Sequence, residues 1–300
     1  MSSANPTSRA PFLTIYAVLV FCFVYLPITV LIAYSFNRDG VGGFPPRHFT
    51  LDWYRQLFAD EGIWNSVLNS LIIALCSVAL ALVLGLLAAL ALDRADFPGK
   101  ALFRRLVLLP LILPGIITGL SLLMFANSAG MQLSLLTVFL GHGTALISIA
   151  TTELFASLQK MDRKQEEASL DLGATPWQTF WRITLPNLKL SLIAAGLLIF
   201  TLSMDEIAVT FFLIGADNTL PLEIWARLRR GITPEINAVS SLIFAVSVAL
   251  IIIWYRIRMR GIGAEPQDIL DGSSRILACE FVEAPSKLPI RKLGQFGELS

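Results

Sequence analysis

Long apolar stretches separated by polar loops dominate the pattern of the chain. An apolar stretch of about 20 residues can cross the roughly 30 Å hydrocarbon layer of a bilayer as an α-helix. Six such stretches can be delimited, at roughly 12–36, 64–92, 106–126, 134–156, 190–216 and 237–257. The pattern therefore predicts an all-α membrane protein with six transmembrane helices. The first stretch is too long for the core of a signal peptide, so we interpret it as a retained anchor.

Composition supports this interpretation. The chain of 300 residues is 55% hydrophobic and only 15% charged, whereas a soluble domain needs more charge to cover its surface. The net charge of +1 argues against nucleic acid as a partner.

The distribution of basic residues predicts the orientation, because lysine and arginine are enriched in cytoplasmic loops. If the N-terminus lies inside, thirteen lysines and arginines fall in the inner segments up to Arg260, and six fall in the outer loops. Both termini and the loop between the fourth and fifth stretches are therefore expected in the cytoplasm.

That cytoplasmic loop, about 157–188, is long enough to need structure of its own. Residues 164–172 are rich in helix formers, and Gly173 suits a left-handed helix cap. Thr175-Pro176 provides an N-cap followed by proline at the first helical position. The pattern predicts two helices joined by a turn, with Pro186 ending the second helix before the fifth span.

The first of these helices is short and acidic, since it carries Glu166, Glu167 and Asp171. It could dock a soluble partner and pass force to the membrane helices. It could equally be a surface hairpin without a partner, and the helical pattern alone leaves both interpretations open.

The spacing within the loop resembles a known family motif. Glu167-Ala168-Ser169 is followed by three residues, Gly173, nine more residues and then Ile183-x-Leu185-Pro186. This resembles the EAA loop of ABC-importer permease subunits, with Ser169 in place of alanine. The resemblance implies a type I ABC-importer permease fold in which this loop couples to an ATPase. It further implies that Glu167 pairs with a basic group of the ATPase, that Ala168 and Ser169 pack closely, and that Gly173 makes the bend.

Three further stretches resemble the second permease subunit of spermidine/putrescine importers: 201–206, 220–225 and 231–238. This implies a permease domain over 1–262 that imports a polyamine across a bacterial inner membrane. The implied partners are two ATPase subunits, a second homologous permease and an extracytoplasmic binding protein. Related permeases carry iron(III), thiamine or other small solutes, so these cargoes stay open as alternatives.

Asp205 and Glu206 interrupt the fifth apolar stretch. A carboxylate at the centre of a membrane helix costs on the order of 3 kcal/mol on insertion scales, so it usually faces protein or water. Neighbouring helical residues point about 100° apart. We expect Asp205 to face the translocation path, where it would offset the charge of a cationic substrate, and Glu206 to face a neighbouring helix or subunit. A purely structural hydrogen bond is the alternative.

The chain contains no phosphate-binding loop of the GxxxxGK[ST] type, no paired metal-ligand spacing and no catalytic triad. We therefore expect neither an enzyme nor a cofactor or metal site, with ATP hydrolysis in a separate subunit. A transporter or channel that works alone remains an alternative, but it leaves the docking loop unexplained. Asp93-Arg94 is interpreted as part of a solvated turn, and the tail 263–300 as disordered.

Overall fold

The computed structural model describes residues 10–38, 48–231 and 234–262, and within these ranges the regular structure is helical. The only strand-like pairing among the described residues is an isolated bridge between Asn37 and Phe49. The all-α fold class predicted from the sequence is confirmed. The predicted tail 263–300 lies outside the described residues.

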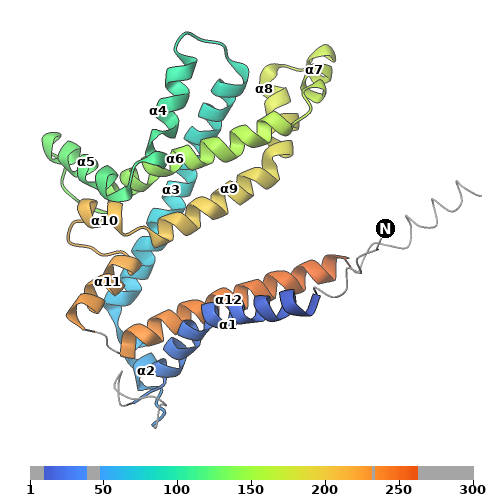
Figure 1. Cartoon of the computed structure of the whole chain (residues 1–300). Coiled ribbons are helices and arrows are strands. Elements are labelled where there is room, and N and C mark those ends of the chain that lie inside the picture. The colour runs from blue at the N-terminus through green and yellow to red at the C-terminus, as the bar shows by residue number, and fades with distance from the viewer. Residues whose placement is uncertain (1–9, 39–47, 232–233, 263–300) are drawn as a thin grey trace, which may run out of the picture. The chain divides into compact units, whose positions relative to one another are not determined.

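The helices follow one another along the chain in Figure 1. Those of the first half are α1 (Ala10–Ser35), α2 (Asp52–Ala59), α3 (Glu61–Arg94), α4 (Lys100–Ile112), α5 (Gly115–Ser128) and α6 (Leu135–Lys160). Those of the second half are α7 (Lys164–Asp171), α8 (Pro176–Thr179), the π-helix η2 (Phe180–Thr184), α9 (Leu185–Asp205), α10 (Ala208–Leu213), α11 (Leu220–Arg230) and α12 (Pro234–Ile262).

The chain divides into two compact units, Met1–Ser241 and Leu242–Ser300, with the boundary inside α12. The contacts described below all lie within the first unit. At the end of this unit, the hydroxyls of Tyr54 and Ser241 lie 2.7 Å apart, so the first turns of α12 are held beside α2.

Four helical segments are long and apolar enough to cross a membrane: Phe12–Ser35, Glu61–Arg94, Leu135–Lys160 and Pro176–Asp205. A fifth span results if α4 and α5 are taken together. The sixth predicted stretch lies in α12, where the apolar segment found within the described residues is Pro234–Ala249.

The third predicted span is not the single helix that the pattern suggested. α4 and α5 are bent by 109° relative to each other across a short break. Pro114 causes this break, because its ring disfavours the helical conformation of the preceding residue and it has no N–H to donate. Leu113 is accordingly extended, with φ −76° and ψ 132°.

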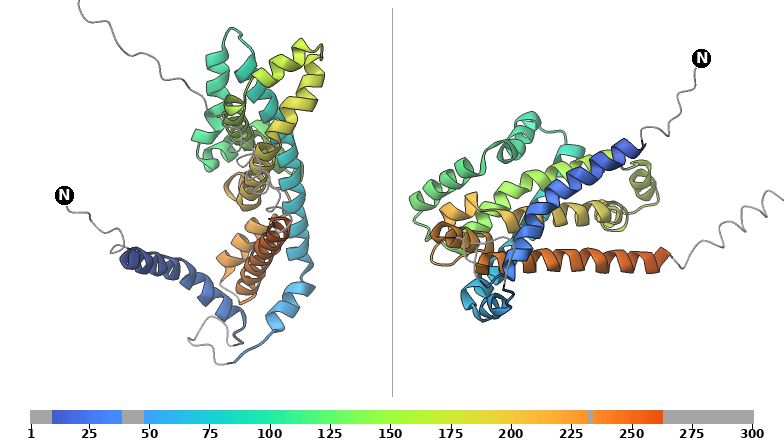
Figure 2. Two further views of the ribbon diagram at one scale, coloured as in Figure 1. Left: turned by 90° about the vertical axis from the view of Figure 1, so that its right-hand side faces the viewer. Right: turned by 60° about the horizontal axis from the view of Figure 1, so that its bottom comes forward.

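The first unit is built around α3, α6 and α9, which contact one another in every pairwise combination. Figures 1 and 2 show α6 and α9 running side by side, with α3 crossing and contacting both. The buried face of α3 consists largely of small residues, which allow helix backbones to approach closely in a membrane. The members of this face include Ser66, Ser70, Ala74, Ser77, Ala81, Gly85, Ala88 and Ala89.

Gly85 shows how close this approach is. A Cβ atom at Gly85 would collide with Cβ of Ala150 and would lie 3.0 Å from the backbone nitrogen of Thr151, both on α6. The absence of a side chain is therefore a packing requirement, and it sets the separation of α3 and α6.

Candidate functional site

The loop that carries the sequence motif has the predicted helix–turn–helix form. α7 ends before Gly173, whose φ of +87° places it in the left-handed region. The Gly173 N–H donates to the carbonyl of Leu170 and the Ala174 N–H to that of Ser169, which satisfies the last carbonyls of α7. Thr175 then caps α8 through a reciprocal pair of hydrogen bonds with Gln178.

Pro186 does not end the second helix, contrary to the prediction. α8, η2 and α9 continue as one apolar helical segment, Pro176–Asp205. A proline inside an α-helix clashes with the carbonyl four residues earlier and cannot donate to it. Here the turn before Pro186 widens into the π-helix η2, in which the Leu185 N–H donates to Phe180, five residues back. The widened turn accommodates the proline, so α8 continues into α9 without a break.

Some residues of the motif are exposed and others pack against the protein. Glu167 and Ala168 are exposed on α7, and no hydrogen bond or ion pair joins Glu167 to another described side chain. Ser169 faces inward, where its hydroxyl lies 3.1 Å from that of Thr179 on α8. In the second half of the motif, Ile183 and Leu185 are half-buried and Pro186 is exposed.

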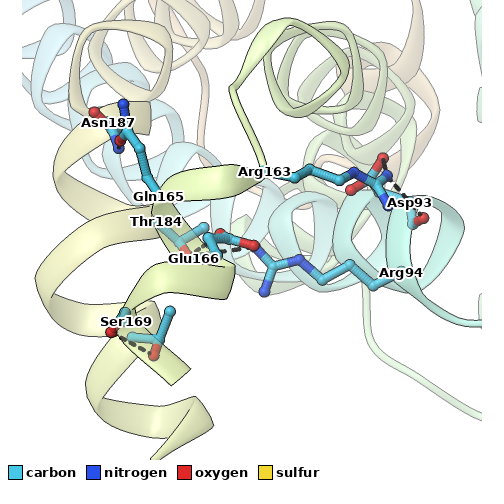
Figure 3. Close-up of polar contacts among 9 residues, drawn as sticks. Asp93, Arg94, Arg163, Gln165, Glu166, Ser169, Thr184 and Asn187 are labelled. Atoms are coloured by element: carbon cyan, nitrogen blue, oxygen red, sulfur yellow. Dashed lines mark hydrogen bonds and ion pairs between the residues drawn. The ribbon is translucent and has the colours of Figure 1, made fainter. Parts of the chain in front are cut away.

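Glu166, the residue before the motif, joins α7 to the membrane helices (Figure 3). Its side chain is only 15% exposed, and its carboxylate accepts hydrogen bonds from the Arg94 guanidinium and the Thr184 hydroxyl. Arg94 also donates to the Thr184 hydroxyl at 3.2 Å. The three side chains come from α7, the end of α3 and η2, so one junction fixes three elements. The sequence pattern gave Glu166 no such role.

A second set of contacts holds the same end of α3. Asp93 accepts from Arg163 at 2.9 Å and from Gln159 at 2.8 Å, and its side chain is only 4% exposed. The interpretation of Asp93-Arg94 as a solvated turn was therefore wrong. Both residues end a long helix. Asp93 points toward Arg163, between α6 and α7, and Arg94 points toward Glu166 on α7 (Figure 3). Sequence spacing carries no signal for pairs about 70 residues apart.

The outer surface of the loop is apolar to an unusual degree. Leu172 is 90% exposed and Trp177 68% exposed, and Trp181 is half exposed. Trp177, Phe180 and Trp181 pack against one another, with ring centroids 5.5 to 5.9 Å apart. Large exposed apolar patches mark sites of contact with another protein or with a membrane.

The two intramembrane carboxylates lie at a helix break, not within a continuous helix as predicted. α9 stops at Asp205, Glu206 is extended with φ −76° and ψ 115°, and α10 begins at Ala208. Asp205 is exposed on the face that also carries exposed Ala194 and Thr201. Glu206 is half-buried and accepts a hydrogen bond from the Val209 N–H at 2.9 Å, so it caps α10.

His142 on α6 contacts both sides of this break, a role that the sequence pattern did not indicate. The side chain is buried, with Nδ1 2.8 Å from the Ser203 hydroxyl and Nε2 2.8 Å from the Thr210 hydroxyl. Ser203 belongs to α9 and Thr210 to α10. One imidazole therefore holds both sides of the break that presents Asp205. The described residues contain no group of three or more side chains suited to a metal.

At the opposite end of α3, Arg227 of α11 organises an ion-pair cluster. Its guanidinium lies 2.8 Å from Asp60, 2.8 Å from Glu223 and 3.8 Å from Glu235. Asp60 also accepts from the Ile63 N–H at 3.1 Å and caps α3. The cluster thus joins the start of α3 to α11 and to the start of α12. Arg227 is committed to these internal partners.

The cluster shifts the pKa values of its members. The hydrogen bond from Arg227 holds the pKa of Asp60 below its usual value, against the opposing effect of burial. Burial alone would lower the pKa of Arg227, but the hydrogen bonds to Asp60 and Glu223 outweigh it and raise the pKa.

Comparison with known proteins adds independent information. Residues 81–262 match the family described as binding-protein-dependent transport system inner membrane component. The putrescine transport system permease protein PotI of Escherichia coli K12 is 36% identical over an alignment of 263 residues, and the match covers 83% of this chain and 92% of that protein. The spermidine/putrescine transport system permease protein PotC of Haemophilus influenzae is 31% identical over 236 residues, 78% of this chain and 91% of that protein.

Solved structures agree on the fold. A chain of a bacterial ABC transporter that imports the acidic polysaccharide alginate superimposes with a TM-score of 0.63 at 17% identity, covering 86% of this chain and 99% of that one. A chain of the inward-facing MetNI methionine ABC transporter gives a TM-score of 0.51 at 16% identity, covering 71% of this chain and 99% of that one.

The Glu166 junction predicts a measurable change in the mobility of α7. In Arg94→Gln, the Glu166 carboxylate loses its charged partner, and a buried polar group without its partner costs about 1–3 kcal/mol. Amide hydrogen exchange across α7 should therefore accelerate by roughly tenfold. Lys164→Gln removes an exposed charge from the same helix and should leave the exchange unchanged. Equal exchange in Arg94→Gln and wild type would show that the junction does not hold α7.

The ion-pair cluster predicts a pH-dependent contribution to stability. Because the pKa of Asp60 is lowered in the folded state, its contribution is complete above the unfolded pKa of about 3.9 and is lost as the pH falls through the lower folded value. Asp60→Asn should therefore cost about 1 kcal/mol at neutral pH, and the difference from wild type should vanish in acid. Thermal unfolding in detergent over a pH series measures this, with exposed Asp217→Asn as control. A difference independent of pH would contradict it.

Proposed function

Because the chain belongs to the family of binding-protein-dependent transport system inner membrane components, we propose that it forms part of the path by which an ATP-driven importer carries a polyamine. The observation that carries this proposal is the similarity to two named polyamine permeases over most of the chain. The substrate is then putrescine, spermidine or a close relative.

Family membership agrees with the sequence prediction of a multi-pass inner membrane protein that is a transport component and not an enzyme. Importers of this kind work with ATPase subunits and with a substrate-binding protein. For this chain we propose two ATPase subunits, a second homologous permease and a binding protein on the extracytoplasmic side. We also propose that both termini and the α7–α8 loop are cytoplasmic, in keeping with the bias of basic residues.

The coupling step is proposed to use the exposed surface of the α7–α8 loop. Glu167 is free to meet a basic group of the ATPase, while Leu172 and Trp177 offer apolar contact area. Motion of the ATPase would move α7, and the Glu166 junction would pass that motion to α3 and η2. Since η2 continues into α9, the same displacement would reach the break at Asp205.

The substrate step is proposed to use Asp205. It is exposed at the end of α9, on the face shared with Thr201, as a carboxylate lining a cation path would be. Glu206 is already engaged with the backbone of α10, so it supports the break and leaves Asp205 as the group for the substrate.

Charge reversal at Glu167 tests the coupling role. We expect Glu167→Arg to insert normally but to lose substrate uptake, because an arginine would repel the basic group that Glu167 is proposed to meet. Uptake in cells and ATP hydrolysis by the reconstituted importer are measured together. Asp96→Arg, the same reversal at an almost fully exposed residue outside α7, should leave both near wild type. Normal uptake by Glu167→Arg would exclude it from docking.

Neutralisation of Asp205 tests the substrate role. An ion pair at about 4 Å and an effective dielectric constant of about 20 is worth about 4 kcal/mol before desolvation, so Asp205→Asn should reduce putrescine uptake by at least roughly tenfold. Asp205→Glu keeps the charge and should retain more uptake than Asp205→Asn. If Asp205→Asn transports putrescine at the wild-type rate, the residue lies outside the path. Loss in both variants with normal membrane levels would point to a structural hydrogen bond.

A further inference from the structure

A cavity at the N-terminal end of α4 is not used by the proposed transport mechanism. Its volume is about 440 Å³, and it lies among α3, α4 and α6, at the end of α3 that also carries the Glu166 junction. Its walls are basic and apolar. The lining residues are Leu92, Lys100, Ala101, Arg104, Arg105 and Phe155.

The charge at this cavity is not neutralised within the described residues. Lys100 is 3.1 Å from Asp96, but Arg104 and Arg105 make no ion pair or hydrogen bond with another described side chain. Arg104 instead places its guanidinium 5.4 Å from the centre of the Phe155 ring, which orients it without cancelling its charge. The N-terminus of α4 adds a partial positive charge, so the cavity favours an anion.

The position of the cavity along α4 favours a lipid as the source of that anion. Beyond Arg105 the helix presents Leu106 and Leu109, which are 57% and 45% exposed. An apolar exposed surface next to a cluster of basic groups marks the level where hydrocarbon gives way to headgroups. A phospholipid can satisfy both parts at once, with its phosphate at the arginines and its acyl chains along the leucines.

We propose that the cavity formed by Lys100, Arg104, Arg105 and Phe155 binds the headgroup phosphate of an anionic phospholipid. The lipid would come from the leaflet on the side of the α7–α8 loop, which is the cytoplasmic leaflet in the proposed orientation. Basic pockets between membrane helices on that side are known to hold anionic headgroups. A lipid seated there would touch both the end of α3 and α6, the elements whose packing supports the coupling loop.

The test uses the complete importer, purified in detergent and titrated with phosphatidylglycerol or phosphatidylcholine, with bound lipid counted by native mass spectrometry. Arg104→Gln with Arg105→Gln should weaken phosphatidylglycerol binding roughly thirtyfold, at about 1 kcal/mol for each basic group. Binding of phosphatidylcholine should not change. Lys160→Gln with Lys189→Gln removes two charges at exposed positions on α6 and α9 and should retain the wild-type affinity.

Four results would overturn the proposal. The first is undiminished phosphatidylglycerol binding in the arginine variant. The second is an equal loss in the lysine control, which would indicate general surface attraction. The third is displacement of the lipid by inorganic phosphate at the same concentration, which would indicate a site for a soluble anion. The fourth is loss of the ATPase or the second permease from the arginine variant, which would assign the arginines to a protein contact. Arg104→Lys with Arg105→Lys keeps the charge and should retain lipid even if the glutamine variant is unstable.

Discussion

The carboxylate of Glu166 is the constraint on which the coupling-loop end of this permease depends. The Glu166 side chain is largely buried, and a buried carboxylate requires hydrogen-bonding or charged partners. Those partners come from the end of α3 and from η2, so the short helix α7 cannot shift without moving both. The neighbouring pair of Asp93 and Arg163 reinforces the same end of α3. An eight-residue helix on its own would fray, and these contacts make it a rigid projection.

Rigidity continues from this junction into the membrane. η2 accommodates Pro186 without interrupting the helix, so α8 and α9 belong to one continuous helical segment, Pro176–Asp205. α3 and α6 approach so closely at Gly85 that no side chain fits between them. The breaks lie farther along, between α4 and α5 and between α9 and α10. A rigid helix that ends at a defined break can transmit a displacement to that break. The break at the end of α9 is where Asp205 is exposed.

The sequence predicted some parts of this structure correctly and missed others. Gly173 and Thr175-Pro176 predicted the helix–turn–helix correctly, because caps and turns depend on local backbone preferences. The breaks at Leu113 and Glu206 were missed, because hydropathy averages over a window and does not register a single extended residue. The pairing of Asp93 with Arg163, and the bonds of His142 to Ser203 and Thr210, depend on residues distant in the chain. No single-sequence pattern specifies such partners.

The most direct test of the central claim is site-directed crosslinking of α7 in the assembled importer. The three native cysteines are replaced by serine, and a cysteine is introduced by Glu167→Cys, Leu172→Cys or, as control, Asp217→Cys. The account predicts that the first two crosslink to an ATPase subunit and are shielded from a membrane-impermeant reagent added outside. Asp217→Cys should not crosslink to the ATPase and should be labelled by the reagent added outside. Failure of both α7 positions to reach the ATPase, or their labelling from outside, would contradict the account.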